Sequence, residues 1–340
     1  MRQVWITRKG APEVLEVREA PDPEPASGEV RVRALRSGIN FADLMARVGL
    51  YPDAPPLPCV VGYEVSGVVD RVGKGVTQVK EGDRVMAMPK FGGYSDTVVV
   101  PEAQAFKMPD AMTFDEGAAL PVVYLTAYTM MMFTGNLRPR STVLIHSAAG
   151  GVGLAAIELA KTRECEIFGL ASPGKHDFLR QRGVQHCFTN EDDWPAEIRR
   201  ITGGKGLDLV LDPVGGKSWK TGYDLLGPCG RLVAFGLSAA ASGKTRSLLH
   251  AVVQVLQIPK FHPRDLMNDN KTVTGVNMGH MFDRVDLLLP QMNDLIALHE
   301  QGKIAPHVAK VFPADEAPAA HHYLHDRKAM GKVLLGWAPT

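Results

Sequence analysis

The sequence predicts an α/β fold in which a domain built on a parallel sheet is inserted into a β-rich domain. Three observations lead to this prediction. A chain of 340 residues is too long for one core of ordinary size, so two domains are expected. Short alternating apolar runs fill the chain to about residue 122, and strand-like runs then alternate with helical segments until about residue 237. The chain ends in another strand-like run, KVLLG.

Alternating apolar positions between Gly and Pro residues predict the strands of the first domain. We expect them in Val30–Asn40, in Tyr63–Gly73 and in the segments EGDRVMAM and SDTVVVP. Near the C-terminus, a helical segment over Val285–Gln301, the stretch AAHHYLHDRKA and the final KVLLG strand close the same domain. The first domain is therefore expected over residues 1–122, completed by residues 275–340.

The inserted domain is expected over residues 123–274, because strands and helices alternate there. The strand-like runs are Thr142–His146, Glu166–Ala171, Leu207–Leu211 and Leu232–Gly236. The helical segments between them include Gly153–Thr162, Lys175–Gln181 and Trp194–Ile201. This alternation predicts a parallel sheet with right-handed crossovers.

Charge and cysteine usage limit the class of protein. Lys plus Arg number 38 and Asp plus Glu 37, so no basic field for nucleic acid is expected. The four cysteines are scattered, which argues against a disulfide framework and a cysteine-rich zinc lobe. The first residues lack the order of a signal peptide, so we expect a cytoplasmic protein.

The uncharged run Gly117–Phe133 has two interpretations, a transmembrane segment or a buried helix. It lies at the short limit of membrane-spanning length and contains Pro121. Acidic residues precede it and Gly135 follows it, which favours a buried helix. We expect no transmembrane segment.

The segment TVLIHSAAGGVGLAA predicts a dinucleotide site. Backbone N–H groups at the start of a helix suit a pyrophosphate, and glycine lets the backbone approach it closely. Ala148 stands where the first glycine is usual, which is tolerated if its φ stays negative. A simple tight turn is the alternative. The predicted cofactor-binding residues are Ala149, Gly150, Gly151, Val152 and Gly153.

The end of the next strand indicates which dinucleotide is bound. NAD-preferring folds carry a carboxylate there for the ribose diol. This chain has Ser172 instead, with Lys175 three residues later. A hydroxyl and an ammonium suit a 2′-phosphate, which favours NADPH. The alternative for Lys175 is a solvated lysine at the start of a helix.

Several motifs together carry a family resemblance: SGINFADLMARVGLYPDAPPLPCVVGYEVSGVVDRVG, SAAGGVGLAA, DPVGG and GKVLL. In these the chain resembles the medium-chain dehydrogenase/reductase superfamily, and within it the zinc-independent quinone oxidoreductases related to zeta-crystallin. It is most similar to their branch of synaptic vesicle membrane protein homologues. The resemblance covers residues 1 to about 337 and implies a GroES-like catalytic domain with a Rossmann domain inserted.

Departures from the zinc enzymes of the superfamily predict that no metal is used. Those enzymes have a cysteine ligand where this chain has SGIN, and Gly-His-Glu where it has Gly62-Tyr63-Glu64. A phenol does not replace an imidazole as a zinc ligand. Without zinc no Lewis acid lowers the pKa of an alcohol, so alcohol oxidation is not expected.

The resemblance implies further site residues. Asn40 and Tyr51 match positions that line the nicotinamide and substrate site, where an amide and a phenol can donate hydrogen bonds. Asp43 would orient Asn40 or a loop. The alternatives are a helix-capping Asn/Asp pair and a core tyrosine. The implied cofactor contacts are Thr126, Asn190 (where relatives hold tyrosine), Phe235, Gly236, Leu237 and Lys332.

We therefore expect an NADPH-dependent, zinc-free oxidoreductase that transfers hydride to a quinone or related conjugated carbonyl. One alternative is an alkenal or enone double-bond reductase. Another is a cofactor-binding protein that works through membranes or partners with little turnover. Residues 238–271 are interpreted as a dimer surface, with a lid or a membrane-surface helix as alternatives. The histidines of AAHHYLHDRK (His321, His322 and His325) lack a closing ligand set for a metal.

Overall fold

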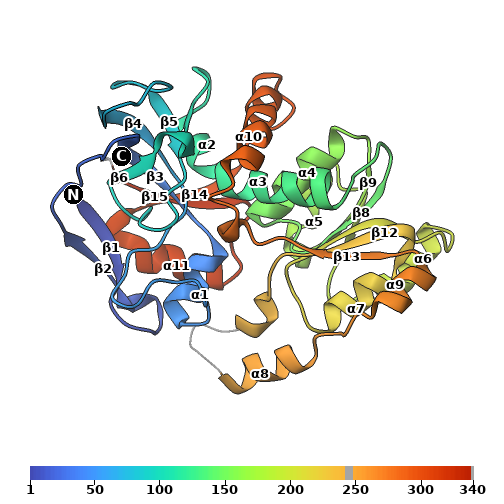
Figure 1. The fold of residues 1–340 in the computed structure, drawn as a ribbon. Helices are drawn as coiled ribbons and strands as arrows, with labels where there is room; N and C mark the ends of the chain where they lie inside the picture. The colour runs from blue at the N-terminus through green and yellow to red at the C-terminus, as the bar shows by residue number, and fades with distance from the viewer. Residues whose placement is uncertain (242–247, 338–340) are drawn as a thin grey trace. The chain divides into compact units, whose positions relative to one another are not determined.

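The chain forms two compact units, and the computed structural model describes residues 1–241 and 248–337 (Figure 1). Unit 1 combines residues 1–125 with residues 279–337, and unit 2 contains the described residues from 126 to 278. Unit 2 thus interrupts unit 1 in sequence, as expected of an inserted domain. The basic segment GKTR at 243–246, part of the region interpreted as a dimer surface, lies outside the described residues.

Unit 2 is built on a parallel sheet of six strands in the order β10-β9-β8-β11-β12-β13. This is the strand order of a Rossmann fold, and it reverses between β8 and β11, where such folds bind ligands. The strands are β8 (Thr142–Ile145), β9 (Glu166–Leu170), β10 (His186–Phe188), β11 (Leu207–Asp212), β12 (Leu226–Ala234) and β13 (Thr272–Gly275).

Helices cover both faces of this sheet, with α4 and α5 on one face and α7 and α9 on the other (Figure 1). The central strands are buried along almost their whole length, which is typical of parallel strands covered on both sides. The helices are α4 (Gly151–Lys161), α5 (His176–Gln181), α6 (Trp194–Ile201), α7 (Lys217–Asp224), α8 (Leu248–Leu256) and α9 (Pro263–Asp269).

Several predicted boundaries in unit 2 were wrong, and α4, for example, begins at Gly151 and not at Gly153. β12 begins at Leu226 and ends at Ala234: Leu226 already pairs with Leu207 of β11, and the regular pairing resumes at Arg231 after an irregularity. The helix expected from Lys175 begins at His176, after a 3-10 turn over Pro173–Lys175 that starts at a proline.

Unit 1 is built on a seven-stranded sheet in the order β14-β15-β3-β4-β5-β7, with β6 paired to β3. The C-terminal strand β15 pairs antiparallel with β3, so the end of the chain completes the N-terminal sheet. The strands are β3 (Glu29–Ile39), β4 (Val65–Val72), β5 (Arg84–Ala87), β6 (Thr97–Pro101), β7 (Ala105–Lys107), β14 (Val308–Pro313) and β15 (Lys332–Gly336). β1 (Arg2–Ile6) and β2 (Leu15–Glu19) form a separate hairpin.

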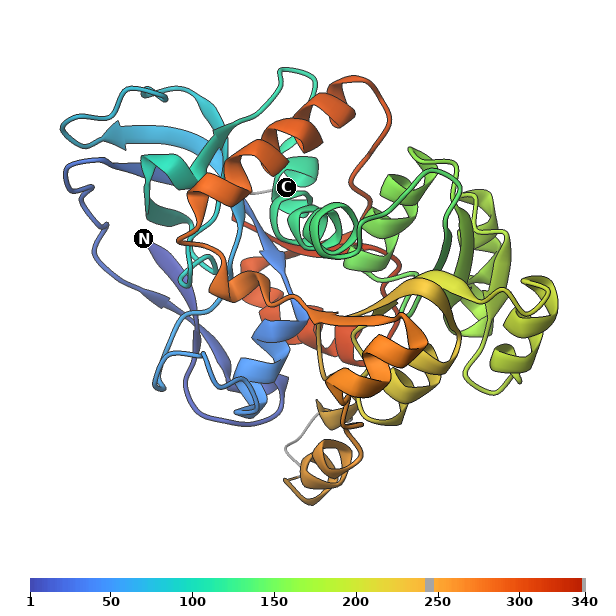
Figure 2. The same cartoon turned by 45° about the vertical axis from the view of Figure 1, so that its right-hand side comes forward.

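Helices α1 (Phe41–Val48) and α11 (Ala317–His325) lie side by side in unit 1 (Figures 1 and 2). α10 (Val285–Glu300) is the longest described helix of the unit. The uncharged run Gly117–Phe133 is mostly buried, although Phe133 is 53% exposed, and it is not one helix: it is divided into α2 (Phe114–Ala119), α3 (Pro121–Tyr128) and a π-helical turn. No helix in the described ranges has the length and apolar character needed to cross a bilayer.

A buried hydrogen-bond network fixes the segments around Asn40. The Asp43 carboxylate accepts hydrogen bonds from the backbone N–H of Asn40 (2.8 Å) and of Gly62 (3.1 Å). It also accepts one from the Tyr94 hydroxyl (3.1 Å), which lies 3.1 Å from Nε2 of His321 on α11. Asp43 therefore orients Asn40 and the loop before β4, as expected.

We predict that Gly153→Ala destabilises unit 2. A Cβ atom at Gly153 would lie 2.5 Å from the Ala148 carbonyl oxygen and 2.6 Å from that of Ser147, so helix and loop must separate. The free energy of unfolding should fall by about 1–3 kcal/mol, the usual cost of overpacking. Urea unfolding followed by circular dichroism measures it. Gly174→Ala is the control, because a Cβ there meets nothing within 4 Å, and an equal loss in both variants would contradict the prediction.

We also predict that His321 makes stability depend on pH. Burial, with Arg47 nearby, holds the pKa of His321 well below its usual value, so the folded protein keeps the imidazole neutral. The unfolded chain takes up that proton below pH about 6.5, so this stabilisation is present above that pH and lost as the pH falls. Burial raises the pKa of Asp43 to about 7, so this group has the opposite effect and lowers stability as the pH rises from about 4 to 7.

The contribution of His321 is therefore measured as the wild-type free energy of unfolding minus that of His321→Gln. This difference should rise by about 1.4 kcal/mol per pH unit between pH 5 and 6.5 and level off above 7. His322→Gln, on the same helix but partly exposed, is the control. A difference that stays flat down to pH 5 would show that His321 is not held neutral.

Candidate active site

The glycine loop between β8 and α4 has the geometry of an anion cradle. Ser147 takes the left-handed conformation (φ 54°), and Ala148 does not, so the substitution of the usual first glycine is tolerated. The Ala148 N–H donates to the Leu170 carbonyl at 3.0 Å, which ties the loop to β9. Gly150 is the N-cap and α4 begins at Gly151. The N–H groups of the first turn have no acceptor within the helix and are available to a diphosphate.

The other residues predicted to bind the cofactor follow the C-terminal ends of neighbouring strands. Ser172 follows β9 and is exposed, with Lys175 at the end of the adjoining 3-10 turn. Asn190 follows β10 and is exposed, and residues 235–237 follow β12. Parallel strands end at one edge of a sheet, so these residues share the edge that carries the glycine loop. Thr126 lies in α3 and is buried.

In unit 1 the structure brings together Asn40, Glu64 and Lys332, which are far apart in sequence. The Lys332 ammonium lies 2.5 Å from Oε1 of Glu64 and donates to Oδ1 of Asn40 at 2.6 Å. Nδ2 of Asn40 donates to the same Glu64 oxygen at 3.0 Å. Glu64 is 0% exposed and Lys332 is 3% exposed, so this is a buried ion pair. We name these three residues the amide cluster.

Each member of the amide cluster is placed by the end of a secondary-structure element. Asn40 lies between β3 and α1, Glu64 directly precedes β4, and Lys332 is the first residue of β15. The second carboxylate oxygen of Glu64 accepts the backbone N–H of Val122 at 2.7 Å, in the first turn of α3. A carboxylate at a helix N-terminus is favoured by the helix dipole.

Tyr51 belongs to a group of aromatic side chains near the amide cluster in sequence and fold. Its ring packs edge-on to that of Tyr63, with centroids 6.5 Å apart. Tyr63 in turn packs against Phe91 at 5.3 Å and Phe282 at 6.0 Å. Burial raises the pKa of Tyr51 above its ordinary value, and that of Tyr63 as well. Both phenols therefore stay protonated at neutral pH and can donate a hydrogen bond.

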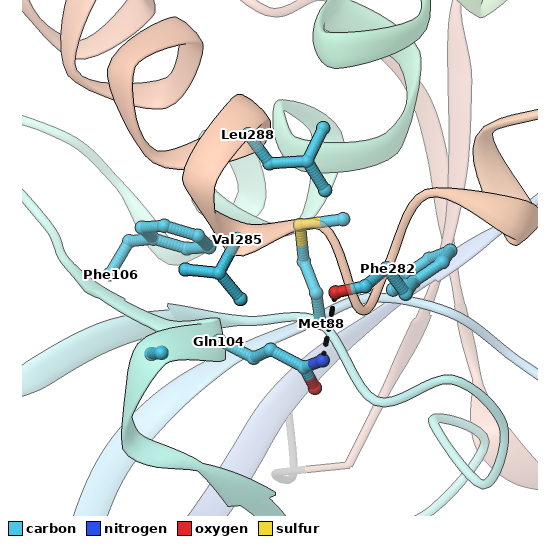
Figure 3. Close-up of a pocket in the computed structure, with 7 residues that line it drawn as sticks. Met88, Gln104, Phe106, Phe282, Val285 and Leu288 are labelled. Atoms are coloured by element: carbon cyan, nitrogen blue, oxygen red, sulfur yellow. Dashed lines mark hydrogen bonds between the residues drawn. The ribbon is translucent and has the colours of Figure 1, made fainter.

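A shallow apolar pocket lies in unit 1, between α10 and the sheet. Figure 3 shows Val285 and Leu288 of α10 facing Met88 and Phe106, with Gln104 Nε2 donating to the Phe282 carbonyl at 3.1 Å. Its volume of about 10 Å³ is room for roughly one water molecule. It is too small for a substrate ring, so it is a packing defect rather than a binding site.

The residues at the zinc positions of the superfamily do not fit a metal. The SGIN segment contains no thiolate, Tyr63 has a phenol in place of an imidazole, and the carboxylate of Glu64 is already bound to an ammonium. In the described ranges, no three His, Cys, Asp or Glu side chains are grouped to hold an ion. The histidines of α11 have other contacts: His321 with Tyr94, His322 with Glu13 and His325 with Arg47.

Two buried acidic residues, one in each unit, were missed in the sequence. Glu64 was noticed only for its neighbour Tyr63, although a glutamate beside the apolar run VSGVV is an unusual buried charge. Asp212, at the end of β11, is also fully buried. Its carboxylate accepts the N–H groups of Val214 (2.6 Å) and Gly215 (3.3 Å) and so holds the DPVGG loop. A lone acid at the end of an apolar strand was the available signal.

Comparison with known proteins identifies the family. Residues 26–110 match the alcohol dehydrogenase GroES-like domain, and residues 151–294 match the zinc-binding dehydrogenase family. The synaptic vesicle membrane protein VAT-1 homolog of Rattus norvegicus is 42% identical over 323 residues, covering 94% of this chain and 80% of that protein. The quinone oxidoreductase of Pseudomonas aeruginosa is 34% identical over 337 residues, covering 98% of this chain and 99% of that protein.

A solved structure shows the same relationship. The crystal structure of Escherichia coli quinone oxidoreductase complexed with NADPH has a TM-score of 0.87 and 30% identity, covering 99% of this chain and 100% of that chain. The α/β fold, with a GroES-like domain and a Rossmann-like parallel sheet, agrees with the sequence-based prediction. The chain belongs to the medium-chain dehydrogenase/reductase family, in the branch that contains the VAT-1 homologues and the quinone oxidoreductases.

Proposed function

We propose that this protein is an NADPH-dependent reductase that delivers hydride to a quinone or a related conjugated carbonyl without a metal ion. The observation that carries the proposal is the amide cluster, in which a buried ammonium and a carboxylate hold the amide of Asn40. Such a site has hydrogen-bond donors but no Lewis acid. It therefore suits an acceptor that is already electrophilic, and the similar quinone oxidoreductases support this class of substrate.

When bound, the nicotinamide supplies the hydride. The protein's residues bind the cofactor, orient the acceptor and polarise its carbonyl group. Gly150–Gly153 would hold the diphosphate through backbone N–H groups. As hydride arrives, negative charge develops on the carbonyl oxygen of the acceptor. The Asn40 amide and the protonated Tyr51 hydroxyl are the donors proposed to stabilise that charge. Thr126, Asn190 and residues 235–237 remain proposed contacts of the cofactor.

NADPH rather than NADH is proposed because no carboxylate follows β9. Ser172 caps the 3-10 turn that ends at Lys175, so a hydroxyl and an ammonium stand at the end of the second strand. A phosphate is attracted by this pair, and a carboxylate would repel it. The similar Escherichia coli enzyme was solved as an NADPH complex, which supports the choice.

A second reaction within the same site is reduction of an alkenal or enone double bond. The donors that polarise a quinone oxygen would polarise an enone oxygen equally, with hydride added at the β-carbon instead. Product analysis with one quinone and one enone separates the two reactions. A saturated ketone from the enone, with no turnover of the quinone, would favour the double-bond reductase.

A function of another class is favoured by the exposed face of α8 and by the names of the relatives. Val252, Val253 and Val255 are each exposed by more than two fifths, and Leu256 is 79% exposed, which is unusual for a soluble surface. The similar rat protein is named as a synaptic vesicle membrane protein. Cofactor binding without turnover of any quinone or enone, together with co-sedimentation with lipid vesicles, would favour a membrane- or partner-binding protein.

The oligomeric state and the cellular location are also proposals. We propose a homodimer formed through an edge strand of the unit 2 sheet, where β13 has partly exposed residues. Sedimentation velocity of the purified protein tests it. The four cysteines are free, in agreement with the proposed reducing cytoplasm.

The function is tested by NADPH oxidation in the presence of 1,4-benzoquinone. We predict that Asn40→Ala lowers kcat/KM for the quinone by roughly 10²–10³-fold, as for loss of one oxyanion donor, with the Kd of NADPH almost unchanged. Asn293→Ala, on the exposed side of α10, is the matched control. A wild-type protein that binds neither NADPH nor NADH would contradict the proposal.

The cofactor preference is tested at Lys175. Lys175→Ala should raise the Kd of NADPH by about tenfold, because one charge-assisted hydrogen bond contributes about 1.4 kcal/mol or more. The Kd of NADH should change less than about twofold, because NADH lacks the 2′-phosphate. Fluorescence titration measures both constants. The control is Lys161→Ala, because Lys161 lies at the C-terminal end of α4, away from the glycine loop. Equal changes in the Kd of NADPH and the Kd of NADH for Lys175→Ala would refute the role of Lys175.

A further inference from the structure

We propose that Lys332 and Glu64 are positioning residues that fix the side-chain amide of Asn40 so that one N–H is presented to the substrate carbonyl. This rests on the proposed function, and it gives Lys332 a different role from the cofactor contact expected from the sequence. Asn40, Glu64 and Lys332 all belong to unit 1, and each contacts the other two through the ion pair and hydrogen bonds given above.

The hydrogen bonds determine which way round the amide lies. An asparagine amide has an acceptor oxygen and a donor nitrogen, and its partners decide the orientation. The Lys332 ammonium only donates, so it requires Oδ1 of Asn40 on its side. The Glu64 carboxylate only accepts, so it requires Nδ2 on its side. Rotating the amide by 180° would place donor against donor and acceptor against acceptor.

This orientation leaves a specific group for the substrate. Of the two hydrogens on Nδ2, one is donated to Glu64, and the other has no acceptor among the described residues. Asn40 is partly exposed, whereas Lys332 and Glu64 are almost completely enclosed, so Asn40 is the member of the cluster that a substrate can reach. The amide therefore offers a donor and not an acceptor, which is what a carbonyl oxygen gaining charge requires.

The cluster is held from several elements and has little freedom to reorganise. The Asn40 backbone N–H is bound by Asp43, and the second oxygen of Glu64 is bound by the Val122 N–H. The Lys332 backbone N–H donates to the His307 carbonyl at 2.9 Å. Preorganised donors stabilise developing charge well because they need not reorient during the reaction.

The burial of Lys332 argues for this role rather than for contact with a cofactor phosphate. Its side chain is 4% exposed and its ammonium is already within 2.6 Å of two acceptors. Binding a phosphate would require the ammonium to leave Glu64 as an unpaired buried charge, which is strongly unfavourable. The chain thus uses the ammonium internally, to orient an amide.

The experiment compares the charge-neutral pair of substitutions Lys332→Met/Glu64→Gln with wild type, which avoids leaving one charge buried alone. The amide that Glu64→Gln introduces can donate to Asn40 or accept from it, so the orientation of Asn40 is no longer fixed. We expect kcat for quinone reduction to fall at least tenfold and the Kd of NADPH to change less than about twofold. Lys328→Met, with a side chain that is 62% exposed, is the control for the loss of a lysine.

A double-mutant cycle separates positioning from any general structural role. If Lys332 and Glu64 act only through Asn40, the pair of substitutions should not lower kcat any further in a protein that already carries Asn40→Ala. Equal losses in both backgrounds would overturn the proposal. An NADPH Kd raised tenfold with kcat unchanged would also overturn it, because Lys332 would then be a cofactor contact.

A measurement without turnover keeps the inference separate from the proposed function. In a ¹⁵N spectrum, the Asn40 side-chain amide, assigned by its loss in Asn40→Asp, should show one hydrogen-bonded, slowly exchanging proton in the wild type only. Two rapidly exchanging protons in the wild type would overturn the positioning role. A protected proton in a protein that reduces no quinone or enone would instead count against the proposed function alone.

Discussion

The ion pair between Lys332 and Glu64 is the constraint on which the proposed chemistry depends. It joins the first residue of the C-terminal strand to the residue preceding β4, at the point where β15 completes the sheet beside β3. Removing two charges from water is costly, and only close contact with further hydrogen bonds offsets the cost. Here the further bonds come from Asn40 and Val122. Loss of one partner alone would cost about 3–5 kcal/mol, so the pair also secures the end of the chain.

Unit 2 is governed by a different constraint, the close approach of backbone to backbone at the glycine loop. Gly153 packs against the carbonyl groups of Ser147 and Ala148, and this contact places the start of α4 at the switch point of the sheet. The left-handed turn falls on Ser147, so an alanine is accepted at the next position. The shape of the glycine loop thus depends on backbone geometry, which the spacing of the glycines in the sequence predicts well.

The sequence predicted those features that depend on neighbours along the chain. The βα alternation and the glycine loop are local, so spacing and residue type identified them, and the capping pair of Asn40 and Asp43 was recognised as an alternative. The start of β12 was missed because its first paired residue, Leu226, is separated from the regular pairing at Arg231 by an irregular stretch of low strand propensity. The amide cluster was not predictable from spacing, because 292 positions separate Asn40 from Lys332 and 24 separate it from Glu64. Only the closure of the sheet by β15 brings them together.

The chemistry of the amide cluster differs from that of a zinc site, and this difference decides which reactions are accessible. A zinc ion lowers the pKa of a bound alcohol and so makes alkoxide available for hydride donation. The amide cluster is electrically neutral as a whole, because Lys332 and Glu64 offset each other. Asn40 can stabilise charge that develops on an oxygen, but it removes no proton from an alcohol. An acceptor that is electrophilic before it binds, such as a quinone or an enone, is the substrate class that such a site can reduce.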